Sequence, residues 1–213
     1  MKTLLYKEIW LAAHPTSIVF AFLGCLVLVP AYPYSVIFMF GCFAPYLTFL
    51  NARETNDVWY TAVLPVTKRE SVLGKCLFVV FIQLFQVFFS IPFTLLRNTL
   101  NIANNPVGLD ATAAWYGLGF ILYAIFDLVF LTTYYKDGYK VGKSLILAAI
   151  PMVLLMAATE ATAHIPSLAW MDSYKPKHLL MQLPILIAGI VCYGAFLPLA
   201  YRISAKRFEK VDL

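Results

Sequence analysis

The sequence predicts an all-α membrane protein whose six transmembrane helices form one domain over residues 1–213. Of the 213 residues, 62% are hydrophobic and only 13% are charged, whereas soluble domains carry about 25% charged residues. The apolar residues also fall into long runs, close to the ~20 residues that a helix needs to cross the hydrocarbon core. These two observations exclude an ordinary soluble domain.

The first element that we expect is an amphipathic helix over residues 1–14. Leu5 and Ile9 share one helical face, and Lys2 and Lys7 lie on the other. This pattern is typical of a helix that lies in the plane of the membrane interface. A plain membrane anchor is one role that this pattern allows.

Six apolar spans follow, and their even number puts both ends of the chain on one side of the membrane. The first two spans are short, and the tyrosines in the tight turn between them fit an interfacial aromatic belt. The expected spans are Thr16–Tyr32, Ser35–Leu50, Val72–Leu96, Ala113–Tyr134, Ser144–Ala163 and Leu179–Tyr201.

The charged loop over residues 51–71 is unlike a solvated linker. Its first half has the pattern of a short amphipathic helix, which Pro65 ends because a proline disfavours helix in the residue before it. Thr67, with Glu70 three residues later, forms a capping box that starts a new helix. The loop is either a firm protrusion for a partner or a well-capped loop at the headgroups.

The distribution of Lys and Arg sets the expected orientation. Of the 16 such residues, all but three belong to the two termini and to the loops after the second and fourth spans. Only Arg97, Lys175 and Lys177 fall on the other side. The positive-inside rule therefore puts both termini and the loop over residues 51–71 in the cytoplasm, with the protein in the cell membrane.

The two long loops on the opposite side differ in composition. Arg97–Thr112 is polar and is predicted to be an ordinary loop. Residues 160–178 mix His164, Trp170 and Tyr174 with apolar residues. We interpret this second segment as either a partly buried external loop or a short re-entrant helix at the outer interface.

The charged segment after the second span resembles the permease subunits of type-2 ABC exporters. The likeness lies in Leu64 and Pro65, followed by Lys68 and Arg69, with Lys75 at the start of the third span. The small permeases of phenol-soluble modulin exporters are the most similar subfamily. The resemblance implies an exporter permease that moves amphipathic peptides or lipophilic compounds and is not itself an enzyme. It also implies that residues 160–178, if they are re-entrant, form an external gate element.

Partners also follow from the resemblance. A separate ATP-binding cassette ATPase would bind ATP and Mg, and this chain would hold no cofactor. A second permease, identical or homologous, would share the translocation path. The resemblance implies that the two permeases meet through the first, second and fifth spans, and small residues in the first two would permit close helix approach. These residues are Ala21, Gly24, Gly41 and Ala44.

The resemblance implies which residues contact the ATPase. In the charged loop, which we term the coupling loop, they are Arg53, Glu54, Asp57, Val58, Trp59, Leu64, Pro65, Lys68 and Arg69. In the N-terminal interface helix they are Lys2, Lys7, Glu8 and Trp10.

No motif points to a catalytic, metal or nucleotide site in this chain. Residues 138–144 look like a phosphate-binding loop, but only three residues separate its glycines and it lies between two apolar helices. The four cysteines lie in apolar runs without metal-ligand spacing. Two alternatives remain: a small-molecule-binding subunit of an uptake system, which needs a polar pocket near the outer face, and an intramembrane enzyme, which needs a nucleophile and a base at one depth.

Asp127 lies near the middle of the fourth span. A charge at that depth costs at least ~2.5 kcal/mol, so we expect the side chain to face the bundle interior. Gln83 and Gln86 on the third span are candidate partners. The cluster is either a polar part of the translocation path or a structural hydrogen bond between helices.

Overall fold

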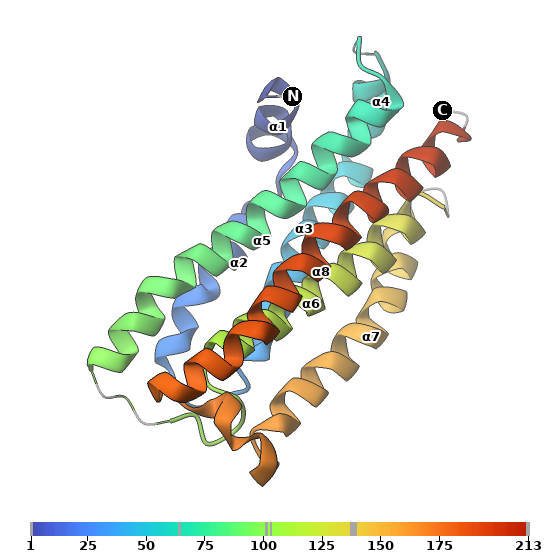
Figure 1. Ribbon diagram of the computed structural model, residues 1–213. Helices are drawn as coiled ribbons and strands as arrows, with labels where there is room; N and C mark the ends of the chain where they lie inside the picture. The colour runs from blue at the N-terminus through green and yellow to red at the C-terminus, as the bar shows by residue number, and fades with distance from the viewer. Residues whose placement is uncertain (1, 64, 101, 103, 137–139, 212–213) are drawn as a thin grey trace.

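A computed structural model describes residues 2–63, 65–100, 102, 104–136 and 140–211 (Figure 1). The chain is 82% helical, with no strand among the described residues. Within these described ranges, five helices are long and apolar enough to cross a membrane, and a sixth candidate is a helix pair bent by 103°. The all-α membrane class predicted from the sequence is confirmed.

The N-terminal segment is a bent pair of helices. Helix α1, Lys2–Lys7, continues as a π-helical turn over Glu8–Ala12. After the bend, α2, Pro15–Phe22, runs into a 3₁₀ helix over Leu23–Leu28. The ring of His14 caps α2 by accepting a hydrogen bond from the Thr16 N–H at 3.2 Å, which fixes the change of direction.

The first span is shorter than predicted. We expected it to reach Tyr32, but its helical part ends at Leu28. Pro30 and Pro33 follow closely, and each lacks the N–H that a helix needs. The eight α-helical and six 3₁₀ residues extend for about 24 Å, slightly less than the ~30 Å hydrocarbon core.

Helix α3, Ser35–Glu54, leads into the coupling loop. Asn56 adopts a left-handed φ of 53°, which asparagine tolerates better than most residues, and the chain turns there into α4, Asp57–Val63. The long helix α5, Lys68–Thr99, starts again after Pro65. The predicted order of helix, proline stop and restart is thus present.

The C-terminal half contains three long helices and one short one. Helix α6, Ala113–Tyr134, has the predicted bounds, and α7, Val141–Thr162, nearly so. A 3₁₀ helix over Pro166–Asp172 precedes α8, Pro176–Glu209. Both termini and α4 lie at one end of the bundle (Figure 1), which we term the terminal end; the other is the distal end.

Helix α6 is the centre of the bundle and packs on α3, α7 and α8. Its Trp115 ring lies 4.3 Å from Phe38, measured between centroids, and the Tyr134 ring lies 4.8 Å from Phe49. Gly117 of α6 lies directly against Gly189 of α8, so that a Cβ on either would collide with the other helix's backbone. This close packing gives the polar residues of α6 fixed positions.

The small residues of the first two spans are used inside the chain. Ala21 and Ala44 are fully buried. A Cβ on Gly24 would lie 2.9 Å from the Gln86 carbonyl oxygen of α5, and one on Gly41 would collide with Tyr123 of α6. The inference that these four residues bring two permeases together is therefore wrong, because they bring helices of one chain together.

Candidate functional site

Four charged side chains connect the N-terminal helix, α4 and the start of α5 at the terminal end. The ammonium of Lys7 lies 2.6 Å from Asp57, and that of Lys75 lies 2.8 Å from Asp57 and 2.6 Å from Glu8. Lys7 also pairs with Glu8 at 3.1 Å. This ion cluster ties the N-terminal helix and α4 to the start of α5.

The cluster is largely screened from solvent, and Glu8 and Lys75 are buried. Burial alone would raise the pKa of Asp57, but the nearby Lys75 and Lys7 outweigh it and hold that pKa below its ordinary value of 3.8. Removing one partner of a buried pair costs about 3–5 kcal/mol, because it leaves a charge without compensation. The ion cluster is therefore a firm attachment for α4.

Helix α4 turns its polar side inward and its apolar side outward. Thr61 is buried and accepts a hydrogen bond from Lys7 at 2.7 Å. On the other side Trp59 is 59% exposed, Tyr60 73% and Val63 86%. These three residues, with Asn56, line a shallow depression. We term Trp59, Tyr60 and Val63 the aromatic face of α4.

The restart after the proline has the predicted capping box. The Thr67 N–H donates to the Glu70 carboxylate at 2.8 Å, and the Glu70 N–H donates to the Thr67 hydroxyl at 3.2 Å. The next residues bind the C-terminal segment: Lys68 donates to the Val211 carbonyl at 2.6 Å, and Arg69 pairs with Glu209 at 2.5 Å. The ends of α5 and α8 are thus connected beside α4.

The other residues predicted to meet the ATPase are placed as follows. Arg53, Glu54, Pro65 and Trp10 are exposed at the terminal end. Leu64 lies outside the described residues, as do the side chains of Lys2 and Val58. Lys68 and Arg69 are engaged with the C-terminal segment, and Asp57, Lys7 and Glu8 with the ion cluster.

A second polar cluster is buried within the bundle. Gln83 of α5 donates to the Asp127 carboxylate at 2.9 Å, and the Tyr193 hydroxyl of α8 donates to the Gln83 carbonyl at 2.8 Å. Asp127 therefore faces protein, with Gln83 as its partner. The second oxygen of Asp127 has no hydrogen-bond partner among the described residues.

Gln86 belongs to a neighbouring set of contacts rather than to the Asp127 cluster. It donates to the Phe20 carbonyl of α2 at 2.9 Å and accepts from the Tyr123 hydroxyl of α6. Together the two glutamines bind α5 to α2, α6 and α8. All these groups lie between helices of the same chain.

The distal end differs from the sequence prediction, which treated Arg97–Thr112 as an ordinary loop. Arg97 and Asp110 form a buried ion pair. The Asp110 N–H donates to Asp172 at 2.7 Å, and Thr112 donates to the Met171 carbonyl at 2.8 Å. Burial raises the pKa of Asp172. The prediction of an ordinary loop is thus wrong for its described end, residues 108–112, which is buried in the core, whereas Asn104, Pro106 and Val107 are exposed.

Glu160 holds the distal end together from α7. Its carboxylate accepts from the Ser35 N–H at 2.8 Å and from the Leu109 N–H at 2.9 Å. It therefore satisfies an unpaired donor at the start of α3. Sequence reasoning missed these contacts, because they join residues more than 50 positions apart and no local spacing marks them.

The family comparison covers nearly the whole chain. Residues 3–209 match the family described as ABC-2 family transporter protein. No curated protein and no solved structure matches the chain.

Proposed function

This chain belongs to the ABC-2 family of transporter proteins, and we propose that it is the permease of an ATP-driven exporter that is coupled to a separate ATPase through α4. The family makes it a multi-pass membrane permease of an ABC transporter rather than an enzyme. It also implies an ATP-binding cassette subunit as partner. Export, the docking site and the cargo are parts of the proposal.

The aromatic face of α4 is the observation that carries the docking site. Exposed large apolar side chains that cluster at one place mark interaction surfaces, and Trp and Tyr are enriched among the residues that dominate binding energy. The aromatic face lies beside exposed Arg53 and Glu54. A partner there would meet an apolar centre with charges at its rim.

The ion cluster explains how force on α4 would reach the transmembrane helices. Asp57 binds Lys75, which lies on α5, and α5 continues through the bundle to Thr99. Glu8 and Lys7 connect the same point to the N-terminal helix. We therefore assign Asp57, Lys7 and Glu8 a positioning role behind the docking surface, and Trp59 and Tyr60 the contact itself.

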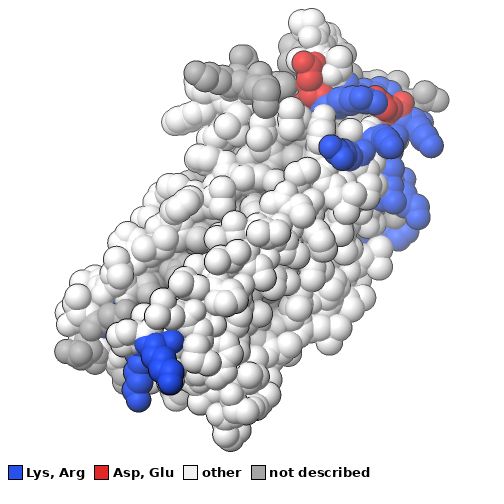
Figure 2. Space-filling model, viewed as in Figure 1, with Lys and Arg blue, Asp and Glu red and all other residues white. Residues whose placement is uncertain are grey.

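Charge supports a cytoplasmic location for the terminal end. Figure 2 shows Lys and Arg gathered near the C-terminus, a smaller basic patch at the distal end, and an uncharged flank between them. The positive-inside rule puts the more basic side in the cytoplasm. An ATPase that uses cytoplasmic ATP could then reach α4.

The cargo and the second permease rest on the likeness to phenol-soluble modulin exporters. That likeness favours amphipathic peptides or lipophilic compounds, carried along an interface between two permeases. The buried Asp127 cluster pairs helices of one chain, so we assign it a structural role rather than a place on the path.

The test of this function is ATP hydrolysis and transport by the purified protein. We expect the chain alone to hydrolyse no ATP, and the chain isolated with its ATPase to do so. With both subunits, inverted membrane vesicles should accumulate a fluorescent amphipathic peptide when ATP is added. Robust ATP hydrolysis by the chain alone would contradict the proposal, and ATP-driven accumulation only in right-side-out vesicles would make it an importer.

A further inference from the structure

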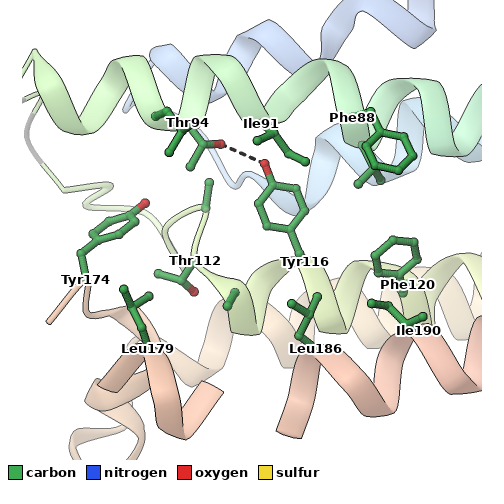
Figure 3. Close-up of a pocket in the computed structure, with 14 residues that line it drawn as sticks. Phe88, Ile91, Thr94, Thr112, Tyr116, Phe120, Tyr174, Leu179, Leu186 and Ile190 are labelled. Carbon is green, nitrogen blue, oxygen red and sulfur yellow. Dashed lines mark hydrogen bonds between the residues drawn. The ribbon is translucent and has the colours of Figure 1, made fainter. Parts of the chain in front are cut away.

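An apolar groove of about 470 Å³ lies between α5 and α8, with α6 as its floor. Figure 3 shows Phe88 and Ile91 on the α5 side and Leu186 and Ile190 on the α8 side. Both helices are long and apolar enough to span the membrane. The natural surroundings of this surface are therefore lipid tails.

Most polar groups in the groove are already paired, although the Tyr174 hydroxyl at one end has no hydrogen-bond partner among the described residues. The Tyr116 hydroxyl points from α6 across to α5 (Figure 3), where it lies 2.9 Å from the hydroxyls of both Thr94 and Ser90. Since the Tyr116 hydroxyl is bonded to both, and those two hydroxyls also donate to backbone carbonyls of α5, an occupant of the groove meets mainly apolar surface. Its wall therefore favours a hydrocarbon ligand.

The length of the groove matches one leaflet of a bilayer. Along α8 it runs from Leu179 to Ile190, which is about 16 Å at 1.5 Å per residue. The hydrocarbon core is ~30 Å thick, so the groove covers about half of it. Tyr174 and Leu179 mark its outer end, and Phe88 and Ile190 its inner end (Figure 3).

Two exposed lysines stand beside the outer end of the groove. Lys175 follows Tyr174, which lines the groove, and Lys177 lies in the first turn of α8. The nearby carboxylates are used within the protein: Asp110 pairs with Arg97, Asp172 accepts from the Asp110 N–H, and Glu160 accepts backbone N–H groups. The surface beside the groove is therefore basic, as the patch at the distal end in Figure 2 shows.

We propose that the groove binds one acyl chain of an anionic phospholipid, with the lipid phosphate at Lys175 and Lys177. The tail extends from the distal surface to mid-membrane between α5 and α8, and the two ammonium groups select an anionic headgroup. The groove length accounts for the tail and the lysine pair for the charge. This site is separate from the docking surface on α4.

The groove is too small to enclose a helix, which is the other occupant that a permease could meet. One turn of α-helix, about 10 Å wide and 5.4 Å high, fills about 420 Å³. A helix lying along all 16 Å would therefore need about three times the available volume. A helix of an amphipathic peptide or of a second copy could therefore lay only one face against the groove, whereas a thinner acyl chain can lie inside it along its length.

The test is photo-crosslinking of the purified chain in bilayer nanodiscs. The probes are phosphatidylglycerol and phosphatidylcholine, both with a photoreactive group in the same tail, and adducts are located by peptide mass spectrometry. We expect adducts on the α5 and α8 peptides that line the groove. Labelling by phosphatidylglycerol should be at least threefold stronger than labelling by phosphatidylcholine.

Two pairs of variants separate the groove from the general membrane surface. Ile190→Trp fills the groove and should lower labelling about tenfold. The control is Val191→Trp, because Val191 is the next residue and is 64% exposed outside the groove. This control should change labelling by less than twofold. Lys175→Gln with Lys177→Gln should remove the preference for phosphatidylglycerol. Lys136→Gln with Lys140→Gln, two exposed lysines before α7, should keep it.

Four results would overturn the proposal. The first is equal labelling of the two Trp variants, and the second is an unchanged lipid preference after loss of Lys175 and Lys177. These exposed lysines can be replaced without disturbing the core, so the second result stands even if Ile190→Trp fails to fold. The third is displacement of the lipid by an added amphipathic peptide that itself forms adducts in the groove. The fourth is a disulfide crosslink between two chains, one carrying Phe88→Cys and the other Ile190→Cys.

Discussion

The two ends of the bundle use charge in opposite ways. At the terminal end, the ion cluster of Lys7, Glu8, Asp57 and Lys75 sits behind a helix that presents aromatic residues to solvent. At the distal end, the ion pair of Arg97 and Asp110 is sealed inside the fold. The first arrangement holds the surface that we propose as the docking site, and the second closes the bundle.

The largest effect is expected at the distal end. Arg97→Met should destabilise the protein by about 3–5 kcal/mol, because Asp110 would keep a buried negative charge without its partner. For a chain of this size that corresponds to a fall in melting temperature of roughly 10 °C. Thermal unfolding in detergent measures it, and a shift no larger than that of Arg53→Met, an exposed residue, would show that the pair does not close the bundle.

Loss of Asp57 should have a smaller effect, about 2 kcal/mol, since hydrogen bonds to charged groups contribute about 1.5–3 kcal/mol and Glu8 still pairs with Lys75. Because the folded pKa of Asp57 lies below its ordinary value of 3.8, its stabilisation is present above that value. It is lost as the pH falls through the folded pKa.

The pH dependence separates Asp57 from a general loss of packing. Asp57→Asn should flatten the fall in melting temperature that the wild type shows below about pH 4, whereas Glu54→Gln, an exposed neighbour on α3, should leave it unchanged. If the melting temperatures of wild type and Asp57→Asn fell identically with decreasing pH, the ion cluster would not contribute to stability as described.

Asp127 lies between the two ends and tests whether the middle of the bundle is structural. Asp127→Asn retains an acceptor for Gln83 and should fold and transport nearly as the wild type does. Asp127→Leu loses that hydrogen bond and should cost about 1 kcal/mol, the usual size of such bonds between membrane helices. Normal folding of the Asn variant with loss of transport would instead make the carboxylate part of the mechanism.

The smallest effect is expected from Arg69→Gln. Its pair with Glu209 is exposed at the terminal end, and exposed pairs contribute little because water screens them. The melting temperature should not change measurably. A clear loss of stability would mean that the connection between the ends of α5 and α8 matters more than the ion cluster beside it.

The sequence predicted the features that depend on local patterns. The spans followed from apolar length, and the restart of α5 followed from Pro65, Thr67 and Glu70, whose capping contacts are only three residues apart. Depth in the membrane was enough to predict that Asp127 faces protein, with Gln83 as one of two candidate partners.

Features that depend on distant residues were missed. Lys75 was predicted only as the start of a span, although it is the buried centre of the ion cluster. Asp110 lay in a segment that looked like an ordinary loop, and its pairing with Arg97 depends on how the distal end folds back. Such contacts join separate elements, so the spacing of neighbouring residues carries no sign of them.

The most direct test of the account is ATPase binding by a variant of the aromatic face. Trp59→Ser with Tyr60→Ser should weaken association of the ATPase at least tenfold in a co-purification titration, while the melting temperature of the permease stays within about 2 °C, because exposed substitutions seldom change stability. Leu154→Ser, an exposed apolar residue on α7, serves as the control and should bind the ATPase normally. Undiminished association of the double variant would contradict the claim that α4 is the docking helix.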